Sequence, residues 1–173
     1  MAALDVDIRH GTAEDIEAVE NLYRATAQKP GGIARAENEI ARAYIQGWVN
    51  SSLERGVWLV AQERTSGQLI GSIHAFSPEP VALRHVLSTL TIVVHPQFQS
   101  QGIGRSMFQI FLEFIRDHRP HILRIELIAR ESNVQAIHFY ESLGYRQEGR
   151  FEKRIRSVDG GFEADIPMAW LRS

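Results

Sequence analysis

Two kinds of hydrophobic spacing alternate along the chain. Some segments place apolar residues three and four positions apart, which predicts amphipathic helices. Others are short runs rich in β-branched and aromatic residues, which favour strands. The expected helices run from Thr12 to a break at Pro30-Gly31-Gly32, and over Glu37–Leu53, Gly102–His118 and Asn133–Leu143. The expected strands are Val6–His10, Val57–Glu63, Leu69–Phe76, Val86–His95, Leu123–Ala129, Tyr145–Ile155 and Phe162–Leu171.

Start and stop signals frame these elements. Thr12 precedes acidic residues and fits an N-cap, whereas Gly56, Gly144 and Pro120 end helices. The expected apolar faces are Ile16, Val19, Leu22 and Tyr23 on the first helix; Ile40, Ala43, Tyr44, Gly47 and Trp48 on the second; and Met107, Ile110, Phe111, Phe114 and Ile115 on the third.

The order of elements is β-α-α-β-β-β-α-β-α-β-β. The strand–helix–strand unit in the second half predicts a local parallel pairing, because such crossovers join parallel strands. The remaining connections favour antiparallel pairing. We therefore expect an α/β (α+β) fold: a mixed, mostly antiparallel central sheet of about seven strands flanked by four helices. The length of 173 residues fits a single domain over residues 1–173.

Composition narrows the function classes. The net charge of −2 argues against a nucleic-acid partner. The chain contains no cysteine, which excludes disulfides, thiolate catalysis and Cys-type zinc sites, and we expect no metal site. The start Met1-Ala-Ala-Leu-Asp-Val-Asp has neither the basic nor the apolar region of a signal peptide. No apolar run reaches membrane-span length, so we expect a cytoplasmic protein without a membrane partner.

The segment Val93–Arg105 suggests chemistry. A strand ends at His95-Pro96, and a short loop leads to Gly102 and Gly104 at the start of a helix. Glycine lets backbone lie close to a ligand. The first amides of the helix, about Gln101 to Ser106, lack intrahelical partners and favour an anion. The segment predicts a pyrophosphate cradle, although two glycines before a helix also fit a plain tight turn. Neither a Rossmann G-x-G-x-x-G nor a Walker A loop is present.

Two sequence blocks together resemble a known family. Gln99-Ser-Gln-Gly-Ile-Gly104 is similar to the Gln/Arg-x-x-Gly-x-Gly/Ala signature of the GCN5-related N-acetyltransferases (GNAT superfamily). Downstream, the segment from Arg124 through Asn133 and Tyr140 to Gly144-Tyr145 resembles the family's strand–Asn-x-x-Ala–helix–Tyr-x-x-x-Gly-Phe/Tyr block. The last strands look like the final hairpin of the bacterial branch that acetylates small molecules, some of them free amino acids.

The resemblance implies acetyl-CoA as co-substrate. Backbone groups of Ile92, Val93 and Val94 would hold the pantetheine arm. Gln99 and Gln101 stand where many members have Arg, so the amides and Arg105 would carry more of the pyrophosphate binding. The implied cofactor-binding set is Ile92, Val93, Val94, Gln99, Gln101, Gly102, Ile103, Gly104, Arg105, Ser106 and Asn133. Asn133 also fits a helix N-cap, and the two roles are compatible.

Two residues are the catalytic candidates. Tyr140 matches the tyrosine that protonates the departing thiolate, although its spacing also fits a core aromatic. Glu126 would take a proton from the amine, because burial in an apolar strand would raise its pKa; it would otherwise pair with Arg124 at an exposed position. Many members carry an acidic residue before the cradle, but this chain has Ser88-Thr-Leu-Thr91, which leaves His74 and His85 as further candidates.

The expected activity is transfer of acetyl from acetyl-CoA to a primary amine of a small molecule, by direct attack in a ternary complex. Acetylation of a protein N-terminus or lysine, and non-catalytic acyl-CoA binding, are the alternatives. A closed pocket at Tyr23, Trp48 and Gly31-Gly32 would favour a small amine, and an open groove over Leu83–Ser88 a peptide. The basic run Arg150, Lys153, Arg154 and Arg156 fits a solvated strand face. The resemblance also implies a homodimer.

Overall fold

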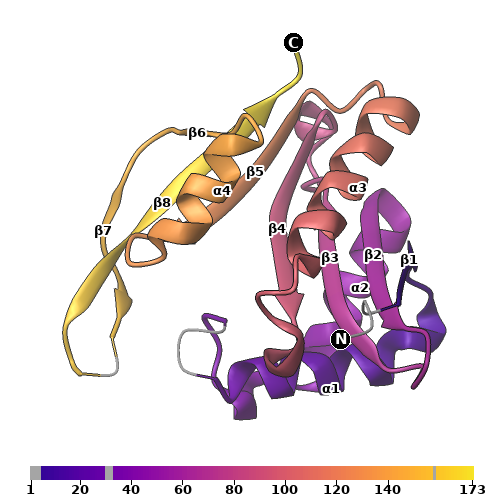
Figure 1. The fold of residues 1–173 in the computed structure, drawn as a ribbon. Coiled ribbons are helices and arrows are strands. Elements are labelled where there is room, and N and C mark those ends of the chain that lie inside the picture. Colours follow the sequence, from indigo (N-terminus) through magenta and orange to yellow (C-terminus); the bar gives the residue numbers. More distant parts are fainter. Residues whose placement is uncertain (1–4, 30–32, 158) are drawn as a thin grey trace. The chain divides into compact units, whose positions relative to one another are not determined.

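The computed structural model describes residues 5–29, 33–157 and 159–173. The Pro30-Gly31-Gly32 break and the first four residues lie outside the described residues. The chain forms two compact units, Met1–Phe76 with Thr91–Arg119, and Ser77–Leu90 with Pro120–Ser173 (Figure 1). The strands run in the order β1-β2-β3-β4-β5-β8-β6, with β7 pairing β8. Over the described residues this is an eight-stranded, mixed and mostly antiparallel sheet with four α-helices, which confirms the predicted fold class.

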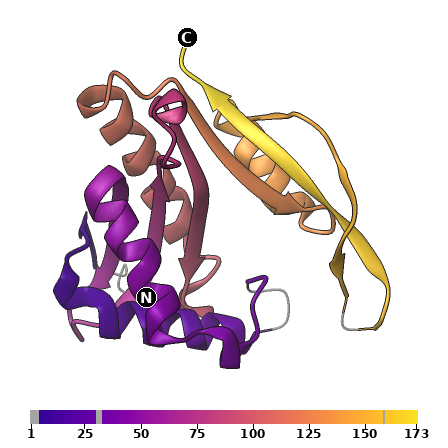
Figure 2. The same ribbon diagram turned by 180° about the vertical axis from the view of Figure 1, so that it is seen from behind.

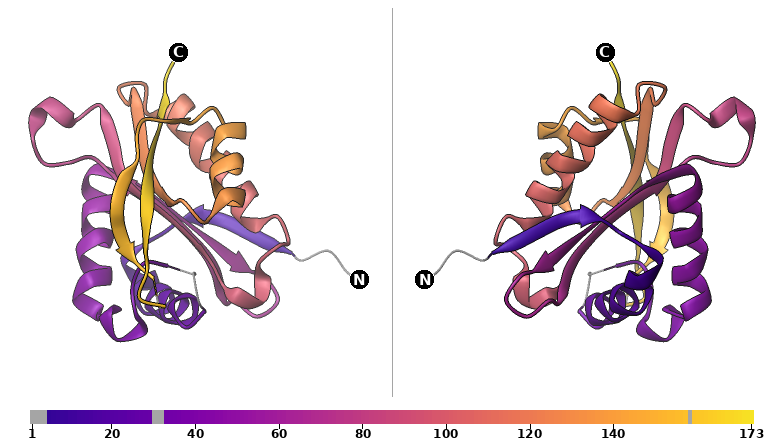
Figure 3. Two further views of the ribbon diagram at one scale, coloured as in Figure 1. Left: turned by 90° about the vertical axis from the view of Figure 1, so that its left-hand side faces the viewer. Right: turned by 90° about the vertical axis from the view of Figure 1, so that its right-hand side faces the viewer.

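The first unit has a sheet covered on both faces. β1 (Val6–His10), β2 (Gly56–Glu63) and β3 (Leu69–Phe76) pair antiparallel, and the second half of β4 (Val86–Val94) follows β3. α1 (Ile16–Ala27) and α2 (Arg42–Arg55) lie on one face, and α3 (Ile103–His118) lies on the other (Figure 3). Because helices cover both faces, nearly every residue of β2 and β3 is buried, and these strands read as continuous apolar runs.

Short 3-10 turns introduce several of these elements. They are Ala13–Asp15 before α1, Glu37–Glu39 before α2, Val81–Leu83 before β4 and Pro96–Phe98 before α3. Asp15 closes the first of them by accepting the backbone N–H of Thr12 at 2.8 Å and pairing with Arg9. The hydrogen bond from the Arg9 guanidinium is the main reason why the pKa of Asp15 lies below its usual value, and it outweighs burial, which acts in the opposite direction.

Two predicted helix faces are wrong. The second helix starts at Arg42 rather than Glu37, because Ile40 has a non-helical backbone and is buried in the turn before the helix. Its buried face is therefore shifted to Ile45, Trp48, Val49 and Ser52. On α3 the predicted Ile110 is exposed, because a helix lying across two strands buries the row centred on Met107 and Phe111 instead. That row adds Ile103, Phe108 and Leu112 to the predicted residues.

The second unit is built on β5 and β8. The start of β4 pairs parallel with β5 (Arg124–Arg130), and β8 (Phe162–Leu171) pairs antiparallel with β5. The predicted parallel crossover is thus confirmed. α4 (Val134–Ser142) lies on one face of this strand pair (Figure 1), and the view from behind shows β5 and β8 in front of it (Figure 2).

The predicted strand Tyr145–Ile155 is wrong in one respect, because it is divided. β6 (Arg146–Gln147) and β7 (Phe151–Arg156) both pair with β8, and residues 148–150 between them lie outside any strand. Glu148 N–H donates to the Pro167 carbonyl at 2.9 Å, but proline has no N–H to return the bond. The ladder is therefore interrupted at this point, which explains a count above the seven strands expected.

No helix within the described residues is long and apolar enough to cross a membrane.

Candidate active site

The loop between β4 and α3 has an unusual backbone. Within the three residues that precede α3, two have left-handed backbone: Ser100 with φ +64° and Gly102 with φ +82°. Left-handed backbone is unfavourable for L-residues other than glycine. A Cβ on Gly102 would meet no atom within 4 Å, so backbone conformation rather than space favours glycine there. Strained conformations of this kind concentrate at ligand sites.

The first amides of α3 follow this backbone directly. Gly102 caps the helix, and its carbonyl accepts the N–H of Ser106 at 3.0 Å. The expectation that the Ser106 amide lacks an intrahelical partner is therefore wrong. The amides of Ile103 and Gly104 precede the first helical hydrogen bond and have no acceptor within the helix. They provide the N–H groups that an anion on the helix axis would use.

Gly104 packs against the strand that leads into the loop. A Cβ there would lie 3.6 Å from Val94 Cγ2 and 3.8 Å from Ile92 Cδ1, which is ordinary contact. Val93, between them, is buried in the core cluster formed with α1 and α2. The segment Ile92–Val94 is thus packed beside the start of α3, and its role in holding a ligand stays a prediction.

The side chain of Gln99 makes hydrogen bonds at both ends of its amide group. Its Nε2 donates to the Val94 carbonyl at 3.0 Å, and its Oε1 accepts a hydrogen bond from Lys29 Nζ at 2.5 Å. Gln101 donates a longer bond, 3.4 Å, to the Gln97 carbonyl. Lys29 was missed in the sequence, because nothing in its local pattern distinguishes it from any lysine that follows a helix. It places a cation beside a loop that carries Gln99 at a position where many members of the resembling family have Arg.

β4 has an irregular point before this loop. Thr89 has φ +54°, which is a costly conformation for a β-branched residue. Within the second unit, the parallel ladder between β4 and β5 contains Val86 and Leu87 and stops before Thr89.

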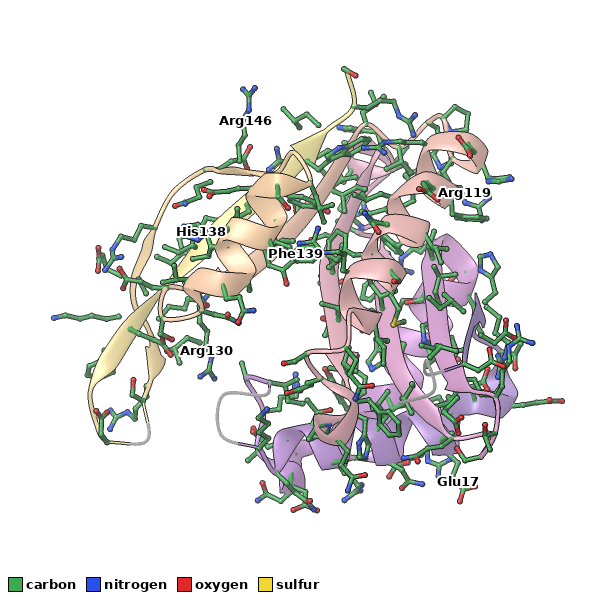
Figure 4. The ribbon with its side chains drawn as sticks, in the orientation of Figure 1. Glu17, Arg119, Arg130, His138, Phe139 and Arg146 are labelled. Atoms are coloured by element: carbon green, nitrogen blue, oxygen red, sulfur yellow. The ribbon has the colours of Figure 1, made fainter. Side chains whose placement is uncertain are left out.

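Tyr140 lies on α4 in the second unit. Its ring lies 5.6 Å from that of Phe139 and 6.0 Å from that of Tyr145. Figure 4 labels Phe139 on this helix. Burial raises the pKa of Tyr140 to about 12, so the phenol keeps its proton at neutral pH. The residue thus has aromatic neighbours, as the alternative interpretation requires, and the protonation state that an acid needs.

Asn133 caps α4. Its Oδ1 accepts the N–H of Ala136 at 3.1 Å, which confirms the N-cap interpretation. Gly144 follows the helix with φ +94°, as predicted for the residue after its C-cap.

Glu126 is not buried, so that expectation is wrong. Its side chain is 37% exposed, and Oε1 accepts a hydrogen bond from Arg124 Nε at 2.6 Å. Arg124 also donates to Glu148 at 2.9 Å. Alternate residues of β5 face opposite sides, and Glu126 falls on the less covered side. The alternative pairing with Arg124 is confirmed, whereas the role of Glu126 as a base stays a prediction.

The histidine candidates differ in position. His85 is exposed at the start of β4. His74 is buried, its Nδ1 lies 3.3 Å from Tyr23 Oη, and its ring stacks on Trp48 at 3.9 Å. Burial lowers the pKa of His74 to about 3, which makes it a weak base. Tyr23 and Trp48 are 1% and 5% exposed and pack in the core, so neither forms an open pocket wall. The Gly31-Gly32 part of that prediction lies outside the described residues.

The basic run near the C-terminus is a solvated face, as expected. Arg150, Lys153, Arg154 and Arg156 are all exposed. Arg154 and Arg156 each cover a phenylalanine ring, Phe151 and Phe162, at 5.1 Å.

The chain is similar to known proteins in sequence and in fold. The profile of the Acetyltransferase (GNAT) family matches residues 16–145. The chain is 30% identical over 96 residues to the ribosomal protein bS18-alanine N-acetyltransferase of Escherichia coli (strain K12), which is 56% of this chain and 63% of that enzyme. It is 30% identical over 93 residues to the mycothiol acetyltransferase of Acidothermus cellulolyticus, which is 53% of this chain and 26% of that protein.

Among solved structures, yncA from Salmonella typhimurium with its cofactor acetyl-CoA has a TM-score of 0.80 at 17% identity, over 96% of this chain and 93% of that one. At this identity the likeness concerns the fold. The chain spans less than two thirds of the length of the curated relatives it matches. Since the family profile covers well over half of its residues, the chain belongs to the Acetyltransferase (GNAT) family.

Proposed function

We propose that this chain is an N-acetyltransferase that moves an acetyl group from acetyl-CoA to a primary amine, with residues 1–173 acting as one domain. The observation that carries the proposal is the left-handed pair Ser100 and Gly102, which directly precedes the two amides without a helical acceptor, those of Ile103 and Gly104 at the start of α3. Backbone amides at the start of a helix are suited to binding the oxygens of a phosphate or diphosphate group. Membership of the family supports CoA as the source of that diphosphate.

The residues present fit this group. The amides of the loop and helix start take the diphosphate, with Arg105 and Lys29 as nearby cations. The backbone of Ile92, Val93 and Val94 takes the pantetheine arm as an added strand. The end of the β4–β5 ladder after Leu87 supports this, because an arm needs strand edges that are not already paired.

When bound, acetyl-CoA supplies the thioester whose C–S bond breaks as the new N–C bond forms. The acceptor amine must reach the carbonyl as a neutral species, because an ammonium has no lone pair. Glu126 is the proposed acceptor of the amine proton, directly or through water. It would first have to release its hydrogen bond with Arg124. Tyr140 donates its phenolic proton to the departing sulfur. Its raised pKa keeps that proton in place until the thiolate forms.

For the acceptor we propose a small-molecule amine, and an amino acid is one such class. A second acceptor class has its own support, since the E. coli relative is named for acetylating the alanine of ribosomal protein bS18. A homodimer and a cytoplasmic location complete the proposal.

The test is thiol release from acetyl-CoA over a panel of free amino acids, polyamines, aminoglycosides and peptides beginning with alanine. Turnover with a small amine and none with peptides supports the proposed acceptor. Turnover confined to peptides would replace it with protein N-terminal acetylation.

A further inference from the structure

One arginine between the first two helices is held in place by a ring rather than by a carboxylate. Arg35 lies in the connector between α1 and α2, and its Cζ is 3.9 Å from the centroid of the Tyr44 ring. The side chain is exposed, and among the described residues no carboxylate lies within ion-pair distance of its guanidinium. A guanidinium over an aromatic face is attracted to the ring and keeps its N–H donors for other partners.

The arginines of the two flanking helices differ from Arg35 in this respect. Arg24 on α1 and Arg42 on α2 both pair with Glu20. Arg55, at the end of α2, pairs with the carboxylate that precedes it. The helices thus neutralise their own arginines, and the connector carries a guanidinium whose charge has no partner among the described residues.

The carboxylates closest to Arg35 in sequence are engaged elsewhere. Glu37 accepts a hydrogen bond from the side chain of Gln28 at 2.8 Å. Glu39 accepts the backbone N–H of Ala36 at 2.7 Å. Both bonds hold the connector against α1 and against its own 3-10 turn. The guanidinium therefore stays over the tyrosine ring although two acidic residues follow it within four positions.

The Tyr44 ring joins Arg35 to the interior of the first unit. Tyr44 makes an edge contact with Tyr23, and their ring centroids are 6.4 Å apart. Tyr44 packs against the core cluster that contains both Tyr23 and Val93 of β4. The proposed function gives the segment around Val93 to the pantetheine arm. Arg35 thus lies over the packed layer that covers this part of β4.

Two anions take part in the proposed reaction, the diphosphate of CoA and any carboxylate that the acceptor carries. α3, whose first amides we have given to the diphosphate, lies on the opposite face of the sheet from α1 and α2 (Figure 3). Lys29 already brings a cation to the loop before α3 through its contact with Gln99. The position of Arg35 on the α1–α2 side therefore favours the acceptor as the source of its anion.

We propose that Arg35 binds a carboxylate of the acceptor, and that the chain thereby prefers amines that also carry a carboxylate. The inference rests on the proposed acetyltransferase function and specifies its acceptor. A guanidinium presents paired N–H donors that match the two oxygens of a carboxylate. The contact with Tyr44 restricts the side chain before the acceptor arrives, so less conformational entropy is lost on binding. An amine without an anionic group gains nothing from this contact.

A binding test that needs no turnover follows the Nε–H resonance of Arg35, assigned with Arg35→Gln, in the full chain saturated with CoA. The probes are N-acetylglycine and its neutral match, N-acetylglycinamide. We expect a saturable shift with N-acetylglycine and none with the amide. The control resonance is the Nε–H of Arg42, which is paired with Glu20. No saturable shift at Arg35, or an equal shift with the amide, would overturn the proposal.

Kinetics supply the second arm. Free amino acids are each compared with their amides at saturating acetyl-CoA. In the wild-type chain kcat/KM should be about 10- to 100-fold higher for the amino acid, the scale of a hydrogen bond to a charged group. Arg35→Gln should bring this ratio close to 1 by raising the KM for the amino acid, and the KM for acetyl-CoA should stay unchanged.

Three further variants separate the guanidinium from its support. Tyr44→Leu should lower the ratio in part, because the guanidinium loses the ring that holds it, whereas Tyr44→Phe should retain the ratio. Arg42→Gln removes an arginine of the same layer and should leave the ratio unchanged. Circular dichroism melts check that each variant folds.

Two kinetic outcomes would contradict the proposal. One is turnover confined to amines without a carboxylate, or equal turnover of amino acids and their amides. The other is a defect of folded Arg35→Gln in the KM for acetyl-CoA alone, which would give Arg35 to the cofactor. Failure of CoA or acetyl-CoA to raise the Tm of the wild-type chain would instead contradict the proposed function.

Discussion

The ammonium of Lys29 donates a hydrogen bond to the side-chain oxygen of Gln99, which itself donates to the carbonyl of Val94. This chain of contacts joins the segment after α1 to the loop before α3. It sets a positive charge beside Gln99, in the loop that leads to the amides of Ile103 and Gly104, where we propose that the diphosphate binds. Gln99 stands where many members of the family have Arg, and Lys29, from a distant part of the sequence, brings a positive charge to it.

Lys29→Met should weaken acetyl-CoA binding several-fold at low salt. An exposed charge acts on phosphate through water, so the difference from wild type should shrink as ionic strength shortens the screening length. Isothermal titration at two salt concentrations measures this. Lys29→Arg is the matched control and should retain the affinity. Equal affinities for wild type and Lys29→Met at low salt would remove Lys29 from the site.

Gly102→Ala and Gly104→Ala separate backbone strain from crowding. Gly102 has φ +82° and open space around it, so alanine should lower the free energy of unfolding by about 1–2 kcal/mol through backbone strain alone. Gly104 lies in the helix with only ordinary contacts to Val94 and Ile92, so alanine there should be neutral or stabilise by up to about 1 kcal/mol. Urea denaturation measures both. A tolerated Gly102→Ala beside a destabilising Gly104→Ala would contradict the loop geometry.

Tyr140→Phe should lower kcat while leaving the KM for acetyl-CoA near its wild-type value, because only the transferable proton is removed. In the wild-type chain this acid should remain protonated up to high pH, since its pKa is about 12. The raised pKa also has a stability consequence. The pKa of a tyrosine in the unfolded chain is near 10. The contribution of Tyr140 to the free energy of unfolding is therefore complete below about pH 10 and is lost as the pH rises toward 12. Tyr140→Phe should lack that alkaline loss in thermal melts, and an unchanged kcat would rule out Tyr140 as the acid.

Glu126→Gln tests the base. If Glu126 takes the amine proton, kcat at neutral pH should fall by about 10²–10⁴-fold. The deficit should narrow at higher pH, because the free amine then loses its proton to solvent. Glu148→Gln is the control, since Glu148 accepts from the same Arg124 and carries no proposed proton transfer. Equal, small effects of the two substitutions would mean that Glu126 only pairs with Arg124.

The sequence predicted most strands and the start of α3 because these depend on local signals. Runs such as Val86–Val94 and Phe162–Leu171 are recognisable from their own residues, and Gly102 marks a left-handed backbone that few other residues adopt. The buried face of α2 was not predictable in the same way. Its phase depends on Ile40 leaving the helix to fill the core, and only tertiary packing decides that.

Side-chain partners were only partly predictable from the sequence, which offered the pairing of Glu126 with Arg124 as an alternative. The burial expected for Glu126 failed because Arg124, two residues earlier on the same face, holds it near the surface. Lys29 meets Gln99 across 70 positions of sequence, and Asp165 lies opposite Arg130 across a strand pairing. The contact of Lys29 with Gln99 and the position of Asp165 opposite Arg130 are set by packing and strand register rather than by local pattern.

The most direct test of the acetyltransferase assignment is the thermal stability of the chain with and without acetyl-CoA. A ligand that binds the folded chain raises Tm by mass action. We predict a concentration-dependent rise in Tm with acetyl-CoA that is absent in Gly102→Glu, where a carboxylate would oppose the diphosphate at the start of α3. No rise in Tm of the wild-type chain at millimolar acetyl-CoA, or the same rise in Gly102→Glu, would contradict the cradle as the acetyl-CoA site.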